Sequence, residues 1–461
     1  KVGKSCGDDL LSNRLLRELA EVLAEPICAL INSSIRQGIV PVQWKVARIS
    51  LIPKVHPPLL IESDLRPISI TSSVSKVAEC FVSRFFNEHF NNFVDRNQFG
   101  CTNNRSTTHA LIKLSDLFFK ASDLSTNFIR ILLVDFSKAF DLVDHNVLLQ
   151  KFINYNFPSH ITAWSLSFLQ GRSQYVRIGN NSSGVLESHA GTPQGTLSGP
   201  NDFKLLINDL LFDLPYFKYV DDTTVVSVSS QPNDCSLQVA SYQLCTWCID
   251  NGMKINVKKT KEMLIHFGKG VNNSEIPMLS INNVTVERVT TFKLLGVVFS
   301  SDLSWSSHVL YLLNKVSRRY YFIFQLVRAG LPSSDIIVIY CSIIRSILEY
   351  ACPVWHCGLT TSQSADIERV QRRCLKIIFP TLSYREALQI SDLEKLCTRR
   401  ERFVRQLFND MKDINHVLHC ILPIRLSQIN STRNNYIYEL PIAKTVRYSN
   451  SFVPYCIRKR Y

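Results

Sequence analysis

Apolar residues recur at helical spacing through the first quarter of the chain. Residues 8–37 place Leu, Ala and Ile among polar residues at that spacing, and Gly38 then ends the predicted helix. β-Branched and apolar residues at 46–52 predict a strand, which a Pro-rich turn follows. Two further amphipathic helices are predicted in this part, at 70–90 and 109–121.

The pattern then changes to strands that alternate with helices. An apolar strand is predicted at 129–135, and from about residue 305 the pattern is helical, with no strand-rich segment. Between these points we predict helices at 145–155 and 160–169, a hairpin at 174–188, and strands at 217–228, 262–267 and 291–300. This order predicts an α+β fold whose sheet starts at strand 129–135 and continues through the last three segments.

Composition and charge add a probable partner to this picture. The chain has 461 residues, enough for two or three domains, and 46% apolar with 20% charged residues is typical of a globular protein. The net charge of +14 is uneven, because residues 1–310 carry +2 and residues 311–461 carry +12. A positive field of this kind attracts a phosphate backbone. The alternative is a solvated basic helical surface.

Fourteen cysteines form no regular framework. Cys245 and Cys248 have the spacing of metal ligands but no matching second pair. The run 352–357 is a slightly better zinc candidate, with Cys341 and Cys374 as the candidates to complete its ligand set. We expect buried reduced thiols rather than zinc, in a reducing compartment. The predicted location is therefore inside the cell, in the nucleus, the cytoplasm or both.

No membrane partner is expected. The first residues lead into charged, helix-like sequence without a signal peptide. The longest apolar stretch, 336–355, is interrupted by Arg345 and Glu349, and we expect it to be too short and too charged to span a bilayer. Because the chain starts with Lys1 rather than Met, we expect it to be a piece of a larger product.

Two adjacent aspartates, Asp221 and Asp222, lie among aromatic and β-branched residues that favour a β-hairpin. Neighbouring carboxylates repel each other, and a hard divalent cation that takes oxygen ligands would neutralise them. Asp135 at the end of an apolar strand is the candidate for a third carboxylate. The alternative for a single Asp is a turn or helix N-cap residue, which is what we expect of Asp141 and Asp144.

These segments, with four others in the same order, resemble the motifs of reverse transcriptases from non-LTR retrotransposons of the jockey-like or RTE-like kind. The carboxylates match the strand-end Asp and the Tyr-x-Asp-Asp hairpin of that family. The four other segments are 52–54 with 64–69, the Pro-Gln-Gly loop 190–200, 256–261 and 292–297. The helix 367–375 matches more loosely.

The resemblance implies a right-hand polymerase: fingers, a palm with an antiparallel sheet, and a thumb followed by a basic helical region. The divisions it implies are 1–125 for the N-terminal helices and fingers, 126–304 for the palm with interleaved fingers and primer-grip elements, and 305–461 for the thumb and C-terminal region. The reverse transcriptase core would span about 45–300. In relatives an endonuclease precedes the polymerase, so we expect that part to be missing before Lys1.

The resemblance also implies an RNA-directed DNA polymerase that extends a primer 3′-hydroxyl by two-metal phosphoryl transfer. Asp135 and Asp221 would bridge two Mg²⁺ ions, for which Mn²⁺ is a possible substitute, and Asp222 would complete the site. The main-chain carbonyl of Phe136 is a further expected ligand. Lys259 would protonate the leaving pyrophosphate, with Lys258 and Lys261 as alternatives.

The implied partners are an RNA template, a DNA primer or target, and dNTPs. The residues expected to contact the dNTP are Lys54, Arg66, Phe140 and Gln194, where the Phe140 ring would select against a 2′-hydroxyl. The residues expected to contact nucleic acid are Arg105, Tyr219, Phe292, Gly296, Arg369, Arg372 and Arg373.

Two departures from the family pattern bear on function. Val220 stands where many relatives have Ala, and 101–103 reads Cys-Thr-Asn where relatives usually show Gly or a basic residue. A group II intron-type maturase is the alternative enzyme, although no maturase or HNH segment is recognisable. The alternative outside enzymes is a catalytically inactive, retroelement-derived fragment that binds nucleic acid.

Overall fold

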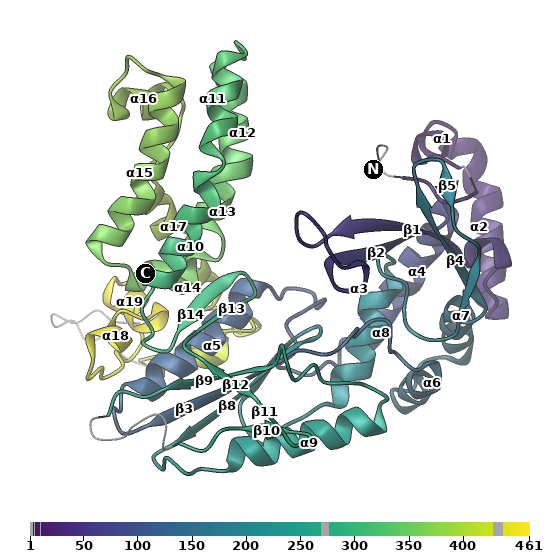
Figure 1. Ribbon diagram of the computed structural model, residues 1–461, viewed down its shortest axis with the longest axis horizontal. Helices are drawn as coiled ribbons and strands as arrows, with labels where there is room; N and C mark the ends of the chain where they lie inside the picture. Colours follow the sequence, from purple (N-terminus) through teal and green to yellow (C-terminus); the bar gives the residue numbers. More distant parts are fainter. Residues whose placement is uncertain (1–2, 4, 10, 269–275, 427–436) are drawn as a thin grey trace.

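The computed structural model describes residues 3, 5–9, 11–268, 276–426 and 437–461. Its ribbon has two arms that rise from one base (Figure 1). The base is a β-sheet with helices on both faces, one arm is built from the N-terminal elements, and the other is the C-terminal helical region.

The base sheet has five strands in the order β12-β9-β3-β8-β7. Its strands are β3 (Phe128–Val134), β7 (Tyr216–Tyr219), β8 (Asp222–Ser229), β9 (Lys261–Ile265) and β12 (Glu287–Val289). The predicted antiparallel palm sheet is therefore correct for β9, β3, β8 and β7, but β12 pairs with β9 in parallel. The segment 291–300 does not continue this sheet, as we had expected. It forms a separate two-stranded sheet of β13 (Thr291–Leu294) and β14 (Val297–Ser300).

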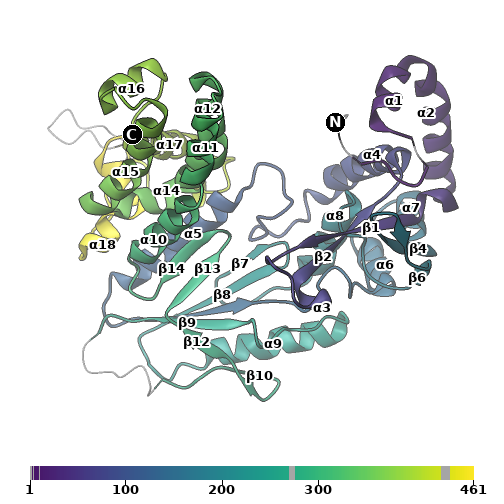
Figure 2. The same ribbon diagram turned by 45° about the horizontal axis from the view of Figure 1, so that its top comes forward.

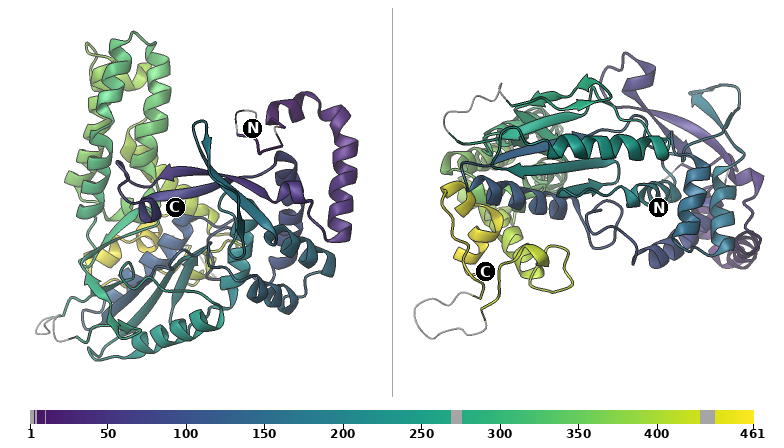
Figure 3. Two further views of the ribbon diagram at one scale, coloured as in Figure 1. Left: turned by 45° about the vertical axis from the view of Figure 1, so that its right-hand side comes forward. Right: turned by 90° about the horizontal axis from the view of Figure 1, so that it is seen from below.

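Every residue of β3 is buried, and its two faces contribute to two different cores. Ile129, Ile131 and Leu133 face a core shared with the C-terminal helices, whereas Leu132 and Val134 face a core shared with the N-terminal arm. This alternation follows from the two-residue period of a strand. The helix α9 (Ser236–Asp250) packs against β8 and β3 on the second face, as the tilted view and the view from below show (Figures 2 and 3).

The N-terminal arm carries the second large sheet, in the order β2-β1-β4-β5, with β6 paired to β4. Its strands are β1 (Val46–Pro53), β2 (Leu65–Ile70), β4 (Arg172–Ile178), β5 (Asn181–Ser182) and β6 (Leu186–Ser188). The predicted hairpin at 174–188 exists, but its placement in the palm is wrong, because β4 pairs in parallel with β1. Two further short strands, β10 (Ser280–Ile281) and β11 (Val284–Thr285), pair with each other.

Helices support these sheets at the predicted places. The predicted helix 8–37 is divided into α1 (Asn13–Glu18) and α2 (Ala20–Gln37), and Gly38 ends α2 with φ +66°, the left-handed conformation that glycine adopts readily. The other helices before the second arm are α3 (Ile61–Asp64), α4 (Ser73–Phe90), α5 (Thr107–Ser122), α6 (His145–Asn154), α7 (Ser159–Leu169) and α8 (Ser198–Leu206), with 3₁₀ turns at Val42–Trp44 and Ile207–Asp209.

In its described residues the second arm has helices but no strand, as predicted, and one isolated β-bridge joins Arg425 to Tyr438. Its α-helices are α10 (Ser306–Ser317), α11 (Tyr320–Arg328), α12 (Ser333–Tyr340), α13 (Ser346–Glu349), α14 (Cys352–Trp355), α15 (Thr361–Ile378), α16 (Tyr384–Ile390), α17 (Leu396–Asp410), α18 (Val446–Ser449) and α19 (Phe452–Arg458). A π-helical segment at Cys341–Arg345 and 3₁₀ turns at His356–Gly358 and His419–Ile421 join them. One core connects this arm to α5, β3 and β14.

The stretch Ser333–Gly358 corrects one expectation, because it is long and apolar enough to cross a membrane by length and composition alone. In the folded chain 39% of its most apolar window is buried. Ile336, Tyr340, Ile344 and Leu348, spaced four residues apart, face the core of the second arm. That spacing is the ordinary signature of a core-facing helix.

Candidate active site

The strand register brings the predicted carboxylates to one end of the base sheet. Val134, the last residue of β3, pairs with Thr223 of β8, so Asp135 and Asp222 leave neighbouring strands at the same level. Tyr219 of β7 pairs with Asp222, which leaves Val220 and Asp221 as the two-residue turn between the strands. Residues 86 positions apart in the sequence therefore share one site.

The three carboxylates influence one another electrostatically. The pKa of Asp222 is raised to about 6 by burial, by Asp221 and by Asp135, in that order. Burial raises the pKa of Asp221 and of Asp135 as well. The charge of Asp135 raises the pKa of Asp221 further. Ionised carboxylates in such a group repel each other, so the site favours a cation.

The chemistry of these donors fits a hard divalent cation, which takes carboxylate oxygens. In the described part of the chain no three His, Cys, Asp or Glu side chains converge closely enough to form a ready-made metal group. The candidate thiols Cys352 and Cys374 are buried, and burial raises the pKa of Cys374 to about 12.

The loop before β9 fixes the main chain at Asp135. The N–H of Asn256 donates to the carbonyl of Asp135 (2.8 Å), and the N–H of Asp135 donates to the Thr260 hydroxyl (3.2 Å). Next to it, buried Phe136 forms a bridge with Ile255. Lys259 projects from this loop, and its charge partly offsets the rise that burial causes in the pKa of Asp135.

Of the three lysines considered for the general acid, Lys259 is therefore the one whose charge acts on the carboxylates. Lys261 lies in β9 and donates to Glu287 and to the carbonyl of Lys258 (both 2.6 Å). These contacts hold the Lys261 ammonium on the sheet edge.

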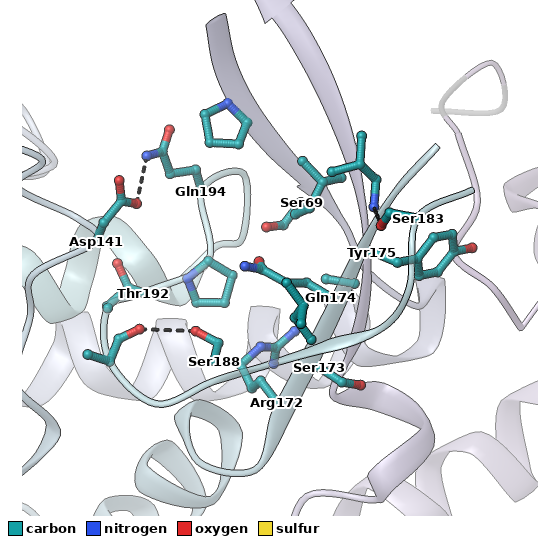
Figure 4. Close-up of a pocket in the computed structure, with 18 of the residues that line it drawn as sticks. Ser69, Asp141, Arg172, Ser173, Gln174, Tyr175, Ser183, Ser188, Thr192 and Gln194 are labelled. Atoms are coloured by element: carbon teal, nitrogen blue, oxygen red, sulfur yellow. Dashed lines mark hydrogen bonds between the residues drawn. The ribbon is translucent and has the colours of Figure 1, made fainter. Parts of the chain in front are cut away.

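The Pro-Gln-Gly loop is anchored between the two sheets. The carbonyl of Gln194 accepts from the N–H of Ser69 in β2 (2.7 Å), and its side-chain amide donates to Asp141 (3.1 Å), the pair visible in Figure 4. Gly195 has φ +105°, and a Cβ there would lie 3.1 Å from the Ile68 side chain. Glycine permits both the backbone conformation and the close approach. Asp144 is the N-cap of α6, as expected.

A cavity of about 390 Å³ lies beside this loop, between β1, β2 and β4. Gln194 is at one end, and the side chains of Arg172 and Gln174 project from β4 within it (Figure 4). The cavity therefore lies where the Gln194 loop meets the β1–β2 hairpin.

Phe140 is half-buried at the base of the loop. Its ring lies 5.1 Å from that of Phe203 in α8, centroid to centroid, and its carbonyl accepts from the N–H of Thr192 (2.8 Å). The contacts with α8 and the loop fix the position of the ring next to the Gln194 loop.

The predicted phosphate-binding cations lie on the β1–β2 hairpin. Arg66 is exposed and pairs with Ile52 across the hairpin, and its charge partly offsets the rise that burial causes in the pKa of Asp221. Lys54 follows β1 directly and is also exposed, and its N–H donates to the carbonyl of Asp64 (2.7 Å). Arg66 is thus the cation of this pair that acts on the carboxylate site.

The predicted nucleic-acid contacts are divided between surface and interior. Arg369, Arg372 and Arg373 are exposed on α15, where Arg369 pairs with Asp366 and the other two lie over tyrosine rings. Arg105 instead donates to the carbonyls of Asp95, Arg96 and Gln98, so its guanidinium is engaged by its own chain. Its contact with a template stays a prediction.

Tyr219, Phe292 and Gly296 lie near the junction of the sheet with the second arm. Tyr219 is half-buried, and its pKa is raised mainly by burial, with smaller contributions from Cys101 and Tyr350. Phe292 is half-buried in β13 and packs on the shared core, while Gly296 turns the β13–β14 hairpin against the Tyr350 ring. The predicted primer-grip residues are therefore close to Tyr350, a residue that the sequence analysis did not select.

Two other supporting residues were missed. Lys218, fully buried in β7, donates to the carbonyls of Ile207, Asn208 and Leu210 and pairs with Asp95 (2.8 Å). Glu79, buried in α4, accepts from the N–H groups of Leu197 and Ser198 at the start of α8. A charged residue inside an apolar run was the available signal for both.

Comparison with known proteins shows which family this chain resembles. Residues 52–299 match the reverse transcriptase (RNA-dependent DNA polymerase) family. The probable RNA-directed DNA polymerase from transposon X-element of Drosophila melanogaster is 27% identical over 391 residues, which cover 81% of this chain and 42% of that protein. The RNA-directed DNA polymerase from mobile element jockey of the same species is 25% identical, with coverage of 66% and 34%.

Among solved structures, the apo telomerase from Candida tropicalis has a TM-score of 0.43 at 13% identity, covering 87% of this chain and 68% of that chain. The chain spans about two fifths or less of the length of the transposon polymerases named above. The expected resemblance to polymerases of non-LTR retrotransposons and the expected α+β right-hand fold are confirmed by the family match. Because that match covers more than half of its residues, the chain belongs to the reverse transcriptase (RNA-dependent DNA polymerase) family.

Proposed function

We propose that this chain is an RNA-directed DNA polymerase that extends a primer 3′-hydroxyl with dNTPs by metal-assisted phosphoryl transfer. The observation that carries the proposal is the register of β3 with β8, which brings Asp135 to the level of the Asp221-Asp222 turn. The raised pKa values of the three carboxylates support a cation as their partner.

Asp135, Asp221 and Asp222 would hold two divalent cations, Mg²⁺ or Mn²⁺, with the Phe136 carbonyl as a further ligand. Such ions, when bound, stabilise charge on the attacking and leaving oxygens. The contribution of the protein is to hold the carboxylates in place through the main-chain bonds at Asp135 and through the hairpin pairing of Tyr219 with Asp222.

The surrounding residues would bind and orient the nucleotide. Exposed Arg66, and Lys54 beside it, would hold triphosphate oxygens, because a planar guanidinium matches them well. Phe140 and Gln194 would border the sugar, and the packing of Phe140 on Phe203 keeps its ring from moving away to admit a 2′-hydroxyl. Lys259 would hold the proton that the pyrophosphate takes.

The nucleic-acid duplex would contact the exposed arginines of α15. Residues 311–461 carry a net charge of +12, and Arg369, Arg372 and Arg373 are exposed there on a single helix. Replacing these three with Gln should reduce the slope of log binding constant against log salt by about 2–3. An unchanged slope would remove α15 from the binding surface.

Primer extension on a poly(rA) template with oligo(dT), dTTP and Mg²⁺ tests the proposed activity. Wild type should synthesise DNA, and Asp221→Asn/Asp222→Asn should lose activity by about a thousandfold or more, since amides bind cations far less strongly than carboxylates. A folded wild-type chain that binds the template but makes no product would favour the alternative, an inactive nucleic-acid-binding fragment.

A further inference from the structure

The turn that carries Asp221 has an unfavourable backbone conformation. Val220 has φ +59°, in the left-handed region. A β-branched residue is rarely found there, because its side chain crowds the adjacent backbone. Conformations of this kind are unfavourable and persist only where the surroundings hold them. Something outside the hairpin must therefore stabilise this turn.

Gln98 is placed to do so. Its side chain is completely buried, and its Oε1 accepts from the main-chain N–H of Val220 (3.0 Å) and of Gly100 (2.9 Å). Because both partners are N–H donors, the orientation of the side-chain amide is determined by its contacts. One oxygen thus joins the turn to the neighbouring loop.

The loop around Gln98 is itself attached to the base sheet. Lys218 donates its N–H to the Asn97 carbonyl and accepts from the N–H of Phe99 (both 2.8 Å), so residues 97–99 extend the sheet beyond β7. Arg105 donates to three carbonyls of the same loop, including that of Gln98 (2.6 Å). Gln98 is therefore a rigid point of attachment.

The contact leaves no room for a larger residue at position 100. A Cβ on Gly100 would lie 2.5 Å from the Val220 nitrogen. Loop and turn are therefore in direct contact at the main chain, and movement of one shifts the other.

We propose that Gln98 is a positioning residue that holds the Val220-Asp221 turn in its left-handed conformation and thereby sets the positions of the Asp221 and Asp222 carboxylates. The inference rests on the proposed polymerase function for its catalytic consequence, but not for the contact itself. Gln98 touches neither nucleotide nor cation in this assignment, because its oxygen is already shared by two N–H groups.

Hydrogen exchange of the 461-residue chain tests the contact without requiring activity. In Gln98→Met, which keeps the length but lacks the acceptor, amides of residues 219–222 should exchange about tenfold faster. Gln371→Met is the matched control, since Gln371 is also fully buried and hydrogen-bonded but lies in α15, and it should leave exchange at 219–222 unchanged.

Kinetics test the catalytic consequence. Gln98→Met should lower kcat by about 10- to 100-fold and change KM for dTTP by less than about twofold, because the nucleotide-binding residues lie on other elements. Val220→Gly removes the backbone strain, so adding it to Gln98→Met should restore most of the lost kcat.

Unchanged exchange at 219–222 in Gln98→Met would overturn the assignment, and so would faster exchange with unchanged kcat. If wild type itself makes no DNA, the proposed function fails. The exchange comparison then still decides whether Gln98 holds the turn.

Discussion

Two hairpins border the candidate active site. Both have a two-residue turn with left-handed backbone conformation, but different contacts stabilise the two turns. The β7–β8 turn consists of Val220 and Asp221, with φ +59° at Val220. The β13–β14 turn consists of Leu295 and Gly296, with φ +45° and +86°. Two-residue turns match the twist of the strands only when such left-handed residues are present.

The difference is in what stabilises each turn. In the β13–β14 turn a glycine occupies the second position. The partly exposed Tyr350 donates its hydroxyl to the Leu295 carbonyl (2.8 Å). In β7–β8 neither position is a glycine, and the acceptor is the fully buried amide of Gln98. The turn that presents the Asp221 carboxylate thus depends on a buried contact, whereas the turn at the predicted primer-grip residue Gly296 depends on glycine.

The largest predicted effect concerns the β13–β14 hairpin, and it is a loss of folding stability at acid pH. The Val298 N–H of β14 donates to Nδ1 of fully buried His308, and burial lowers the pKa of His308 to about 4, from an ordinary value of 6.5. Because the folded chain disfavours the charged ring, the stability that neutral His308 contributes is complete above pH 6.5. It is lost as pH falls from 6.5 toward 4, by up to about 3 kcal/mol.

Urea unfolding at pH 7 and pH 4.5 measures this loss. His308→Gln, which cannot be protonated, should show a smaller decrease between the two pH values than wild type. An equal decrease in both proteins would mean that His308 does not titrate in this range.

A smaller effect is expected from Gly296→Val. The new Cβ would meet the Tyr350 ring at 2.8 Å, and φ +86° is strained for valine, so we expect a loss of about 1–3 kcal/mol in the free energy of unfolding. Val220→Gly is the opposite substitution in the other hairpin and should not cause a comparable loss. If both changes destabilise equally, the two turns do not differ as described.

The smallest effect should come from Tyr350→Phe. Loss of the hydroxyl removes its bonds to the Leu295 carbonyl and to Thr107 (3.1 Å), at a cost of about 1 kcal/mol because the site is partly exposed. Tyr321→Phe, at a tyrosine whose side chain is 64% exposed, is the control and should change stability by less than about 0.5 kcal/mol. Equal unfolding midpoints for all three proteins would exclude a supporting role for the Tyr350 hydroxyl.

The sequence predicted the positions of helices and strands better than it predicted which strands pair and which side chains meet. The position of Asp135 after β3 and of Asp221 in a hairpin follows from local patterns, and both are where the prediction puts them. The pairing of β4 with β1 was missed, because a two-residue period indicates a strand but does not say which sheet it joins. Gln98 was also missed, since an amide in a loop has no signal until the fold brings Val220 to it.

The same limit applies to the charged residues. In the sequence, Arg105 cannot be distinguished from an exposed loop arginine. In the structure, its guanidinium donates hydrogen bonds to three carbonyls of its own loop. Arg369, Arg372 and Arg373 lie on the polar face of a helix whose apolar period is regular, and their exposure could be predicted. Helical periodicity fixes which side a residue faces, whereas an irregular loop does not.

The central claim is that Asp135, which follows strand β3, acts in one site with Asp221 and Asp222 of the β7–β8 hairpin. The most direct measurement is primer extension on poly(rA) with oligo(dT) by Asp135→Asn, beside the same substitution at Asp144, which is the N-cap of α6. We predict a loss of about a thousandfold or more for Asp135→Asn, and less than about twofold for Asp144→Asn, since Asn caps a helix as well as Asp does. Wild-type activity in a folded Asp135→Asn chain would contradict the account.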